Sequence, residues 1–156
     1  MNNALMGKYV AVVNRREQKY VNEILQPYNL GFSCYKFLLF LSRNEGCNQK
    51  KLCRDMCVDE AVATRGMRKL QAEGYVCRKR TKEDGRSYAL YLTDKGKGLV
   101  PVIRETVRDW WDQVMKNFTE AERETLIRLL EQMWRNVMEL TEEEKEGEST
   151  DGSQRK

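Results

Sequence analysis

The sequence predicts a mainly α-helical protein with one small β-hairpin (α+β). Charged residues make up 33% of the 156-residue chain and hydrophobic residues 40%, with only two prolines. This composition is typical of soluble, helix-rich proteins. Apolar residues recur at helical spacing along most of the chain, and the pair Asp84-Gly85 favours a tight hairpin turn. We expect one domain over residues 1–141, followed by a polar, disordered tail over residues 142–156.

The composition also argues against several classes of protein. The chain contains no histidine, the commonest general base and metal ligand, so we expect no enzyme activity, no metal site and no cofactor. The longest apolar run, Phe37–Leu41, is far shorter than the roughly 20 residues of a membrane span. The first residues lack the pattern of a secretory signal, which favours a cytoplasmic protein. The five cysteines are then expected to be reduced thiols.

The first part of the chain predicts two helices. The first extends over residues 4–26, with apolar residues at broadly helical spacing, and it ends at Pro27. Ser33 is the expected N-cap of the second helix, residues 34–43. The centre of this second helix is apolar on all sides, so we expect it to be buried.

Two further helices follow, joined by a short turn. Asn48 is the expected N-cap of the first, residues 49–56, and Asp59 is that of the second, which ends near Gly74. The expected apolar side of the second helix consists of Val62, Met67 and Leu70. Two helices joined by a turn, the second with a basic outer face, are typical of a helix-turn-helix.

A change of periodicity then predicts a β-hairpin. Residues 75–78 and 87–92 are rich in aromatic and β-favouring side chains. The segment between them contains Asp84-Gly85, and glycine accepts the positive φ of a hairpin turn. A basic hairpin that directly follows a basic helix is a wing. The predicted architecture is therefore a winged helix-turn-helix with further helices at both ends.

The last part of the chain predicts two long helices. Thr93 is the expected N-cap of the first, which extends to about residue 117 and has a kink or break at Pro101. Thr119 and Glu122 form a capping box for the second. Apolar residues at spacings of three and four in the second helix favour packing against another helix. The residues expected at this contact are Leu126, Leu130, Met133 and Val137.

Charge is distributed unevenly along the chain. Residues 48–98 contain 13 Lys and Arg against 7 Asp and Glu, a net +6, whereas residues 99–146 contain 7 against 12, a net −5. A basic segment of this kind fits a polyanion such as nucleic acid. Charge alone does not distinguish this interpretation from an unevenly solvated surface.

Four segments together resemble the MarR family of bacterial transcriptional regulators. They are Val58–Leu70 and Glu73–Arg78, which resemble the recognition helix and first wing strand, and Asp84–Arg86 and Leu92–Gly96, which resemble the wing tip and the start of the next helix. The order of elements agrees from about residue 5 to residue 141. One departure is Gly66, where the family has a larger apolar residue. A glycine there would permit a close helix contact, although it costs about 1 kcal/mol relative to alanine.

The resemblance implies a homodimeric repressor bound to a near-palindromic operator in double-stranded DNA. Residues 33–98 would bind DNA, and residues 1–32 and 99–141 would mainly form the dimer. Many members release DNA when a small phenolic, drug-like or oxidant signal arrives. We therefore expect a small aromatic or drug-like ligand as a further partner.

The candidate DNA contacts are basic or polar residues of the second helix of the helix-turn-helix and of the wing. Arginine and threonine on the outer face of that helix suit base edges in the major groove, and Glu60 suits cytosine N4. The resemblance places Arg86 at the wing tip in the minor groove. Other lysines and arginines suit phosphates. The complete set is Lys50, Glu60, Thr64, Arg65, Arg68, Lys69, Arg80, Lys82 and Arg86. The alternatives are a solvated face, or an ion pair between Arg65 and Asp84.

The sequence says less about a signal. Aromatic side chains that suit a ligand pocket suit the hydrophobic core equally well; they are Tyr9, Tyr20, Tyr35, Trp110 and Trp111. Cys34, at a predicted helix N-terminus, is the candidate redox thiol. A thiol-based redox regulator of the same fold is thus one alternative function. Another is a winged-helix protein-interaction module that does not bind DNA.

Overall fold

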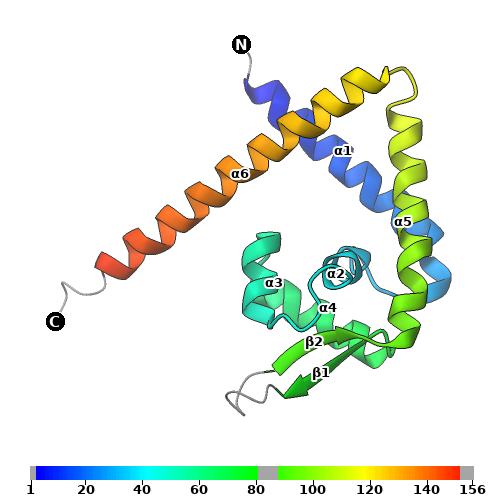
Figure 1. Ribbon diagram of the computed structural model, residues 1–156, viewed down its shortest axis with the longest axis vertical. Helices are drawn as coiled ribbons and strands as arrows, with labels where there is room; N and C mark the ends of the chain where they lie inside the picture. Colours follow the sequence, from blue (N-terminus) through cyan, green and yellow to red (C-terminus); the bar gives the residue numbers. More distant parts are fainter. Residues whose placement is uncertain (1–2, 81–87, 152–156) are drawn as a thin grey trace. The chain divides into compact units, whose positions relative to one another are not determined.

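The computed structural model describes residues 3–80 and 88–151, with side chains described as far as Leu140. The chain divides into two compact units, Met1–Val114 and Met115–Lys156. The described elements are α1 (Asn3–Ile24), a 3-10 helix η1 (Gln26–Tyr28), α2 (Tyr35–Leu41), α3 (Gln49–Met56), α4 (Glu60–Ala72), β1 (Val76–Arg80), β2 (Tyr88–Leu92), α5 (Asp94–Val114) and α6 (Glu120–Asp151) (Figure 1). The predicted fold class, helices with one antiparallel hairpin, is confirmed. Within the described part, no helix is long and apolar enough to cross a membrane.

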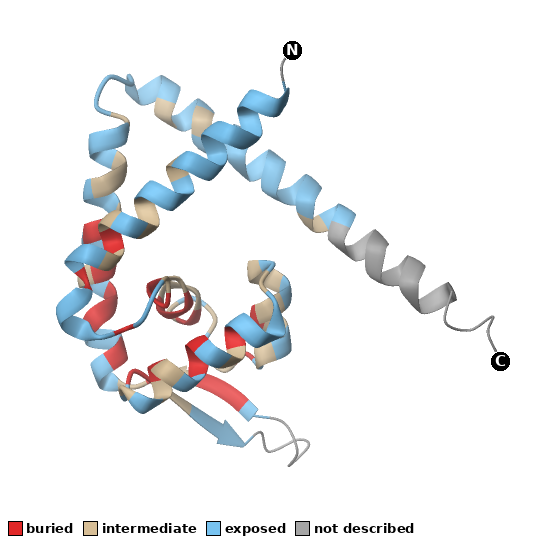
Figure 2. Cartoon of the chain, turned by 180° about the vertical axis from the view of Figure 1, so that it is seen from behind, coloured by how far each residue is buried: buried red, intermediate tan, exposed pale blue. Residues whose placement is uncertain are grey.

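The hydrophobic core lies in the first unit, where α2, α4, β2 and α5 meet (Figure 2). Helix α5 packs against α1, α2 and β2, and α4 packs against α3 and β1. The largest fully buried side chains are Tyr35, Leu38, Leu41, Leu52, Met67, Leu70, Leu90 and Ile103. In the all-apolar run of α2, Phe37, Leu38 and Leu41 are buried as the sequence predicts, whereas Leu39 and Phe40 are half-buried. In α1, by contrast, Val21 is the one described residue that is buried.

The prediction that Ser33 caps α2 is wrong. The N-cap of α2 is Cys34, which makes no side-chain capping bond. Ser33 instead has a left-handed backbone with φ of 59°, and its amide donates a 3.0 Å hydrogen bond to Asn22 Oδ1 on α1. A long-range side-chain contact therefore determines this turn, and local capping preference does not.

The caps of the next two helices agree better with the sequence. Asn48 Oδ1 accepts a 2.8 Å hydrogen bond from the Lys51 amide at the start of α3. Asp59 occupies the N-cap position of α4 without a side-chain bond, and Gly74 ends the helix with φ of 73°. Val62 was predicted to be on the apolar side, but it is 41% exposed. The buried side of α4 is formed by Ala63, Gly66, Met67 and Leu70.

The hairpin has a regular antiparallel register, from Val76 opposite Leu92 to Arg80 opposite Tyr88. The residues before α3 extend it on the β2 side. The Gly46 amide donates to the Leu90 carbonyl at 2.9 Å, and the Leu90 amide donates to the Cys47 carbonyl at 2.8 Å. These bonds attach the start of the helix-turn-helix to the base of the wing.

Helix α5 begins at the expected cap, because Thr93 Oγ1 accepts a 3.1 Å hydrogen bond from the Gly96 amide. The sequence predicts a kink or a break at Pro101; a break is absent, since α5 is one continuous helix through this exposed proline. Its buried residues lie at helical spacing on one side: Gly96, Leu99, Val100, Ile103 and Thr106. Packing of this side offsets the loss of one backbone hydrogen bond.

The second unit consists mainly of α6. Its capping box is confirmed: Glu122 Oε2 accepts from the Thr119 amide at 2.8 Å, and Thr119 Oγ1 accepts from the Glu122 amide at 3.3 Å. The helix continues to Asp151, whereas the sequence predicted that it ends near Thr141, before a disordered tail. Glutamate and lysine favour helix even where no apolar face is present. No residue of α6 up to Leu140 is buried (Figure 2).

Candidate nucleic-acid interface

Helix α4 has an outward face opposite its buried side. This face consists of Ala61, Arg65 and Arg68, all exposed and related by spacings of three and four. Within the described residues neither guanidinium makes an ion pair. Two long cations and a methyl group therefore project from one side of a helix. Arginine pairs with guanine O6 and N7, and a methyl group contacts the thymine methyl.

Thr64 and Lys69 flank this outward face on its two sides, and both are half-buried. Thr64 Oγ1 accepts a 2.7 Å hydrogen bond from Gln49 Nε2 of α3. Lys69 Nζ lies 3.0 Å from Glu73 Oε1, and Asn29 donates to the same oxygen. Thr64 is thus hydrogen-bonded to α3, whereas Lys69 is connected through Glu73 to Asn29, in the turn before α2.

The wing contributes three consecutive exposed cations on β1, Arg78, Lys79 and Arg80. The Lys79 ammonium lies 4.9 Å from the centroid of the Tyr91 ring. The Arg80 guanidinium lies 5.9 Å from the Tyr88 ring centroid. Cation–π contacts of this kind orient long side chains while leaving hydrogen-bond donors free for phosphate.

A hydrogen-bonded link connects the wing with the helices. Arg78 Nη2 donates a 2.9 Å bond to Gln49 Oε1, and Gln49 in turn donates to Thr64. Gln49, Lys50, Glu60 and Arg78 also line a cavity of about 400 Å³ at this junction. Three elements, α3, α4 and β1, therefore present polar groups around one hollow.

Gly66 determines how closely α4 approaches α2. A β-carbon at this position would overlap the Phe37 ring and lie 2.9 Å from Cδ2. The close helix contact that the sequence analysis attributed to this glycine therefore exists. It sets the depth of α4 and hence the position of the two arginines on its outward face.

Comparison with known proteins agrees with this geometry. The profile of the MarR family matches residues 34–88. The crystal structure of a MarR transcriptional regulator from Methanosarcina mazei Go1 has a TM-score of 0.83 and 32% identity, over 88% of this chain and 99% of that chain. The transcriptional regulator SarZ of Staphylococcus aureus is 31% identical over 107 residues, 69% of each protein.

The chain belongs to the MarR family. A Listeria monocytogenes protein similar to MarR regulators, crystallised with a 26mer DNA, has a TM-score of 0.83 and 26% identity to this chain, over 90% of this chain and 93% of its own. This member of the MarR family is accordingly a DNA-binding transcriptional regulator.

The structure brings most of the predicted DNA-binding residues of this MarR protein into one region. Thr64, Arg65 and Arg68 lie on or beside the outward face of α4. Lys50 and Glu60 lie at the cavity near it. Lys69 is paired on the far flank, with Glu73. Lys82 and Arg86, together with Asp84, the suggested partner of Arg65, are outside the described residues.

Sequence reasoning missed three residues of this region: Gln49, Ala61 and Arg78. Arg78 shares a face of β1 with buried Val76, two residues earlier, so strand alternation alone does not indicate that its side chain is exposed; only its place in a basic run did. Ala61 could have been found from the helical phase of Arg65 and Arg68. Gln49 gave no sequence signal, because it is an uncharged residue in a first helical turn. Its role depends on hydrogen bonds to Thr64 and Arg78, which are distant in the sequence.

No disulfide joins the five cysteines, all of which lie in the part of the chain that the structure describes. Cys34 is 5% exposed, and burial raises the pKa of its thiol, an effect that Lys69 partly opposes. A buried thiol with a raised pKa forms little thiolate and is a slow nucleophile. This geometry does not favour Cys34 as a redox sensor.

The aromatic residues suggested for a ligand pocket lie in varied surroundings. Tyr35 is buried and donates to Glu17 Oε1 at 3.2 Å, and burial raises the pKa of its hydroxyl. The Tyr20 and Trp110 rings are in contact in a tilted arrangement, with centroids 5.4 Å apart and planes 38° apart. Tyr9 is 59% exposed. None of the five lines the larger cavity described below.

Proposed function

We propose that this MarR protein is a homodimeric repressor that binds a near-palindromic operator. The observation that carries the proposal is the outward face of α4, on which Arg65 and Arg68 are exposed, together with the exposed cations of β1. Two such faces in a twofold-symmetric dimer would meet successive major grooves of one duplex, which explains why operators of symmetric regulators are near-palindromic.

The DNA contacts divide into two kinds. Arg65, Arg68 and Thr64 would contact base edges, and Glu60 would accept from a cytosine amino group. Lys50, Arg78 and Arg80 would contact phosphates, which determine register and affinity but not sequence. On the family resemblance alone, Lys82 would join them and Arg86 would enter the minor groove. Lys69 is the weakest member of the set because Glu73 already holds its ammonium group.

Helix α6 supports the homodimer. Its apolar side chains are exposed within the protomer: Leu130 is 42% exposed, Met133 43% and Val137 49%, and Leu126 is half-buried. Ile127 and Trp134, each 54% exposed, widen the apolar surface. Apolar surface of this extent on a single helix indicates a protein partner, and a second α6 has the matching spacing.

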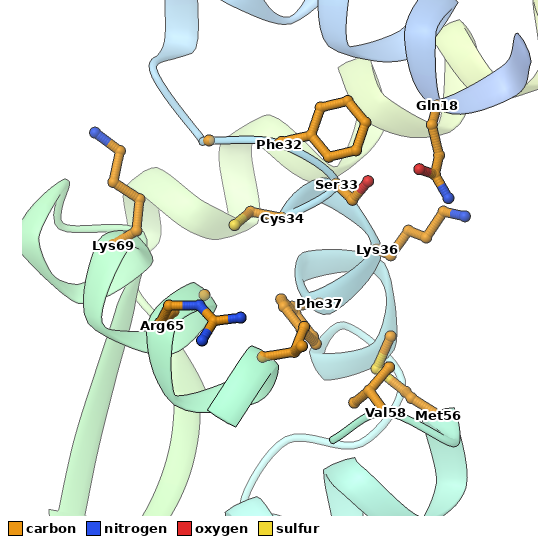
Figure 3. Close-up of a pocket in the computed structure, with 13 residues that line it drawn as sticks. Gln18, Phe32, Ser33, Cys34, Lys36, Phe37, Met56, Val58, Arg65 and Lys69 are labelled. Atoms are coloured by element: carbon orange, nitrogen blue, oxygen red, sulfur yellow. The ribbon is translucent and has the colours of Figure 1, made fainter. Parts of the chain in front are cut away.

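A cavity of about 540 Å³ between α1, α2 with the segment before it, and α4 supports release by a small ligand (Figure 3). Its volume is within the range of small-molecule sites. Phe32, Phe37 and Val62 contribute apolar walls, and Lys36 and Arg65 contribute cationic groups. A small aromatic anion would suit this lining, and it would engage Arg65, one of the arginines proposed to contact DNA.

DNA recognition is tested by fluorescence anisotropy with a duplex selected from a randomised pool by the wild-type protein. Arg68→Ala should weaken binding to the selected duplex about 5- to 100-fold, because one bidentate base contact provides roughly 1–3 kcal/mol. A control duplex with the same bases in scrambled order should bind weakly to both proteins, and this binding should weaken steeply as the salt concentration rises. Wild-type protein that does not distinguish the two duplexes would contradict operator reading. Failure of the wild-type protein to retain any duplex from the randomised pool would favour the protein-interaction module.

The ligand is tested with benzoate as the first probe. Benzoate should displace the wild-type protein from the selected duplex, and Lys36→Glu should reduce this effect several-fold while leaving DNA affinity unchanged, since Lys36 is on the opposite wall of the cavity from α4. Equal displacement of both proteins would remove this cavity from the mechanism. Displacement by peroxide in place of benzoate, abolished in Cys34→Ser, would establish the redox alternative.

A further inference from the structure

The link between Arg78, Gln49 and Thr64 has a defined direction. A guanidinium group has donors and no acceptor, so the atom of the Gln49 amide that faces Arg78 must be the oxygen, 2.9 Å away. The amide nitrogen must then face Thr64, at 2.7 Å from Oγ1. Arg78 thus determines the orientation of the Gln49 side chain, an assignment that otherwise depends on how the amide is flipped.

The direction extends to the threonine hydroxyl. Because Gln49 Nε2 can only donate, Thr64 Oγ1 must accept, and its own O–H must point elsewhere. In helices that proton often bonds to the carbonyl four residues earlier, as Thr106 does with Val102 at 2.9 Å. Thr64 makes no such bond among the described residues. Its hydroxyl proton is therefore available on the side of α4 that borders the outward face.

We propose that Gln49 is a positioning residue for sequence recognition, which makes the Thr64 hydroxyl a hydrogen-bond donor toward the DNA major groove. The base-pair edge that Thr64 meets must then present an acceptor, such as guanine O6 or N7, adenine N7 or thymine O4. Gln49 itself lies half-buried in the first turn of α3 and contacts no base in this account. The inference rests on the proposed DNA-binding function.

Replacement of Gln49 by glutamate reverses the direction of the link. A carboxylate accepts from Arg78 as the amide oxygen does, but it also accepts from Thr64, so the hydroxyl proton turns inward. The threonine then offers only lone pairs to DNA. The side-chain length and the bond to Arg78 are preserved, so Gln49→Glu separates the direction of the hydrogen bond from packing.

The experiment measures base preference at every position of the selected duplex for wild-type, Thr64→Val and Gln49→Glu proteins. Thr64→Val identifies the base pair that Thr64 reads, by loss of preference there. Gln49→Glu should lose the same preference, about three- to tenfold in affinity as expected for one hydrogen bond, and retain the others. Lys50→Gln is the matched control: it makes the same change of charge on the adjacent residue and should weaken all duplexes equally.

The outcomes are distinct. If Gln49→Glu keeps the wild-type preference at the position that Thr64→Val loses, or if Thr64→Val loses none, the inference is wrong. If wild-type protein selects no sequence at all, the proposed function fails first. Should Gln49→Glu melt well below the wild type, Gln49→Met takes its place. Methionine does not donate a hydrogen bond to Thr64, so the direction of the Thr64 hydroxyl is no longer fixed in this variant. Gln49→Met should therefore weaken the same base preference and no other, and an unchanged preference would likewise overturn the inference.

Discussion

Helices α4 and α6 both carry apolar residues at spacings of three and four, but only α4 buries its apolar side within the protomer. Helix α4 buries four of its 13 residues, and its polar side faces outward. Helix α6 buries none of its described side chains up to Leu140. The same periodicity therefore indicates an internal contact in one helix and an external one in the other. Burial, rather than spacing, distinguishes the part that folds from the part that assembles.

The largest effect on stability is expected in α4, the helix whose apolar side is buried. Leu70 on α4 is fully buried, so Leu70→Ala should lower the free energy of unfolding by about 2–5 kcal/mol through lost packing and a residual cavity. Urea unfolding should give the same loss at low and high protein concentration. Leu130→Ala on α6 should instead have an effect that depends on concentration, because it acts through assembly. Equal, concentration-independent losses for the two variants would remove the distinction between the helices.

The next effect concerns assembly itself. Leu130→Glu places a carboxylate in the proposed contact between two α6 helices, where it would be desolvated without a partner. The dimer dissociation constant should rise at least about 100-fold, as for a central interface residue, in sedimentation velocity. Glu131→Gln is the control, since its exposed pairing with Arg135 at 3.9 Å contributes little. A stable Leu130→Glu dimer would place the interface elsewhere.

A smaller effect is expected at the contact that sets the depth of α4. Gly66→Ala should destabilise the protein by about 1–3 kcal/mol through overlap with Phe37, even though alanine is the better helix former by about 1 kcal/mol. Phe37→Leu in the same chain should recover part of this loss, which a double-mutant cycle measures. Stabilisation by Gly66→Ala alone would show that the ring moves aside without cost.

The smallest effect lies at the start of α6. Hydrogen bonds from the amide and hydroxyl of Thr119 lower the pKa of Glu122 below its ordinary value. Their contribution to stability is therefore full above that ordinary value and is lost as pH falls through the lowered pKa of the folded state. Thr119→Ala should raise the pKa of Glu122 toward normal in an NMR titration and cost about 1 kcal/mol of helix stability. An unchanged pKa would mean that the backbone amide alone holds the carboxylate.

Local signals predicted the elements that depend on neighbouring residues. The caps at Asn48, Thr93 and Thr119 and the paired strands of the hairpin follow from short-range chemistry. Ser33 is not the cap because its amide bonds to Asn22, eleven residues away, and this contact outweighs local capping preference. The helix continues through Pro101 because the buried side of α5 is packed on both sides of the proline in sequence. Val62 was assigned to the wrong side because two residues of the buried side of α4 are Ala63 and Gly66. Such small side chains give little hydrophobic signal in a sequence, so the larger apolar valine was chosen instead.

The candidate site divides in the same way. Arg65 and Arg68 could be placed outward from helical phase alone. The role of Gln49 could not, because it depends on which groups of α4 and β1 lie within hydrogen-bond distance of its amide. The pairing of Lys69 with Glu73, four residues later in the chain, follows helical spacing and could have been predicted.

The most direct test of the division between α4 and α6 compares a full palindromic duplex with its half-site. Affinities would be measured for wild-type, Arg68→Ala and Leu130→Glu proteins. We expect Arg68→Ala to weaken binding to both duplexes. Leu130→Glu should bind the half-site like the wild type but lose the additional affinity for the full site. Wild-type affinity of Leu130→Glu for the full site, or weakened binding to the half-site by that variant, would contradict the account.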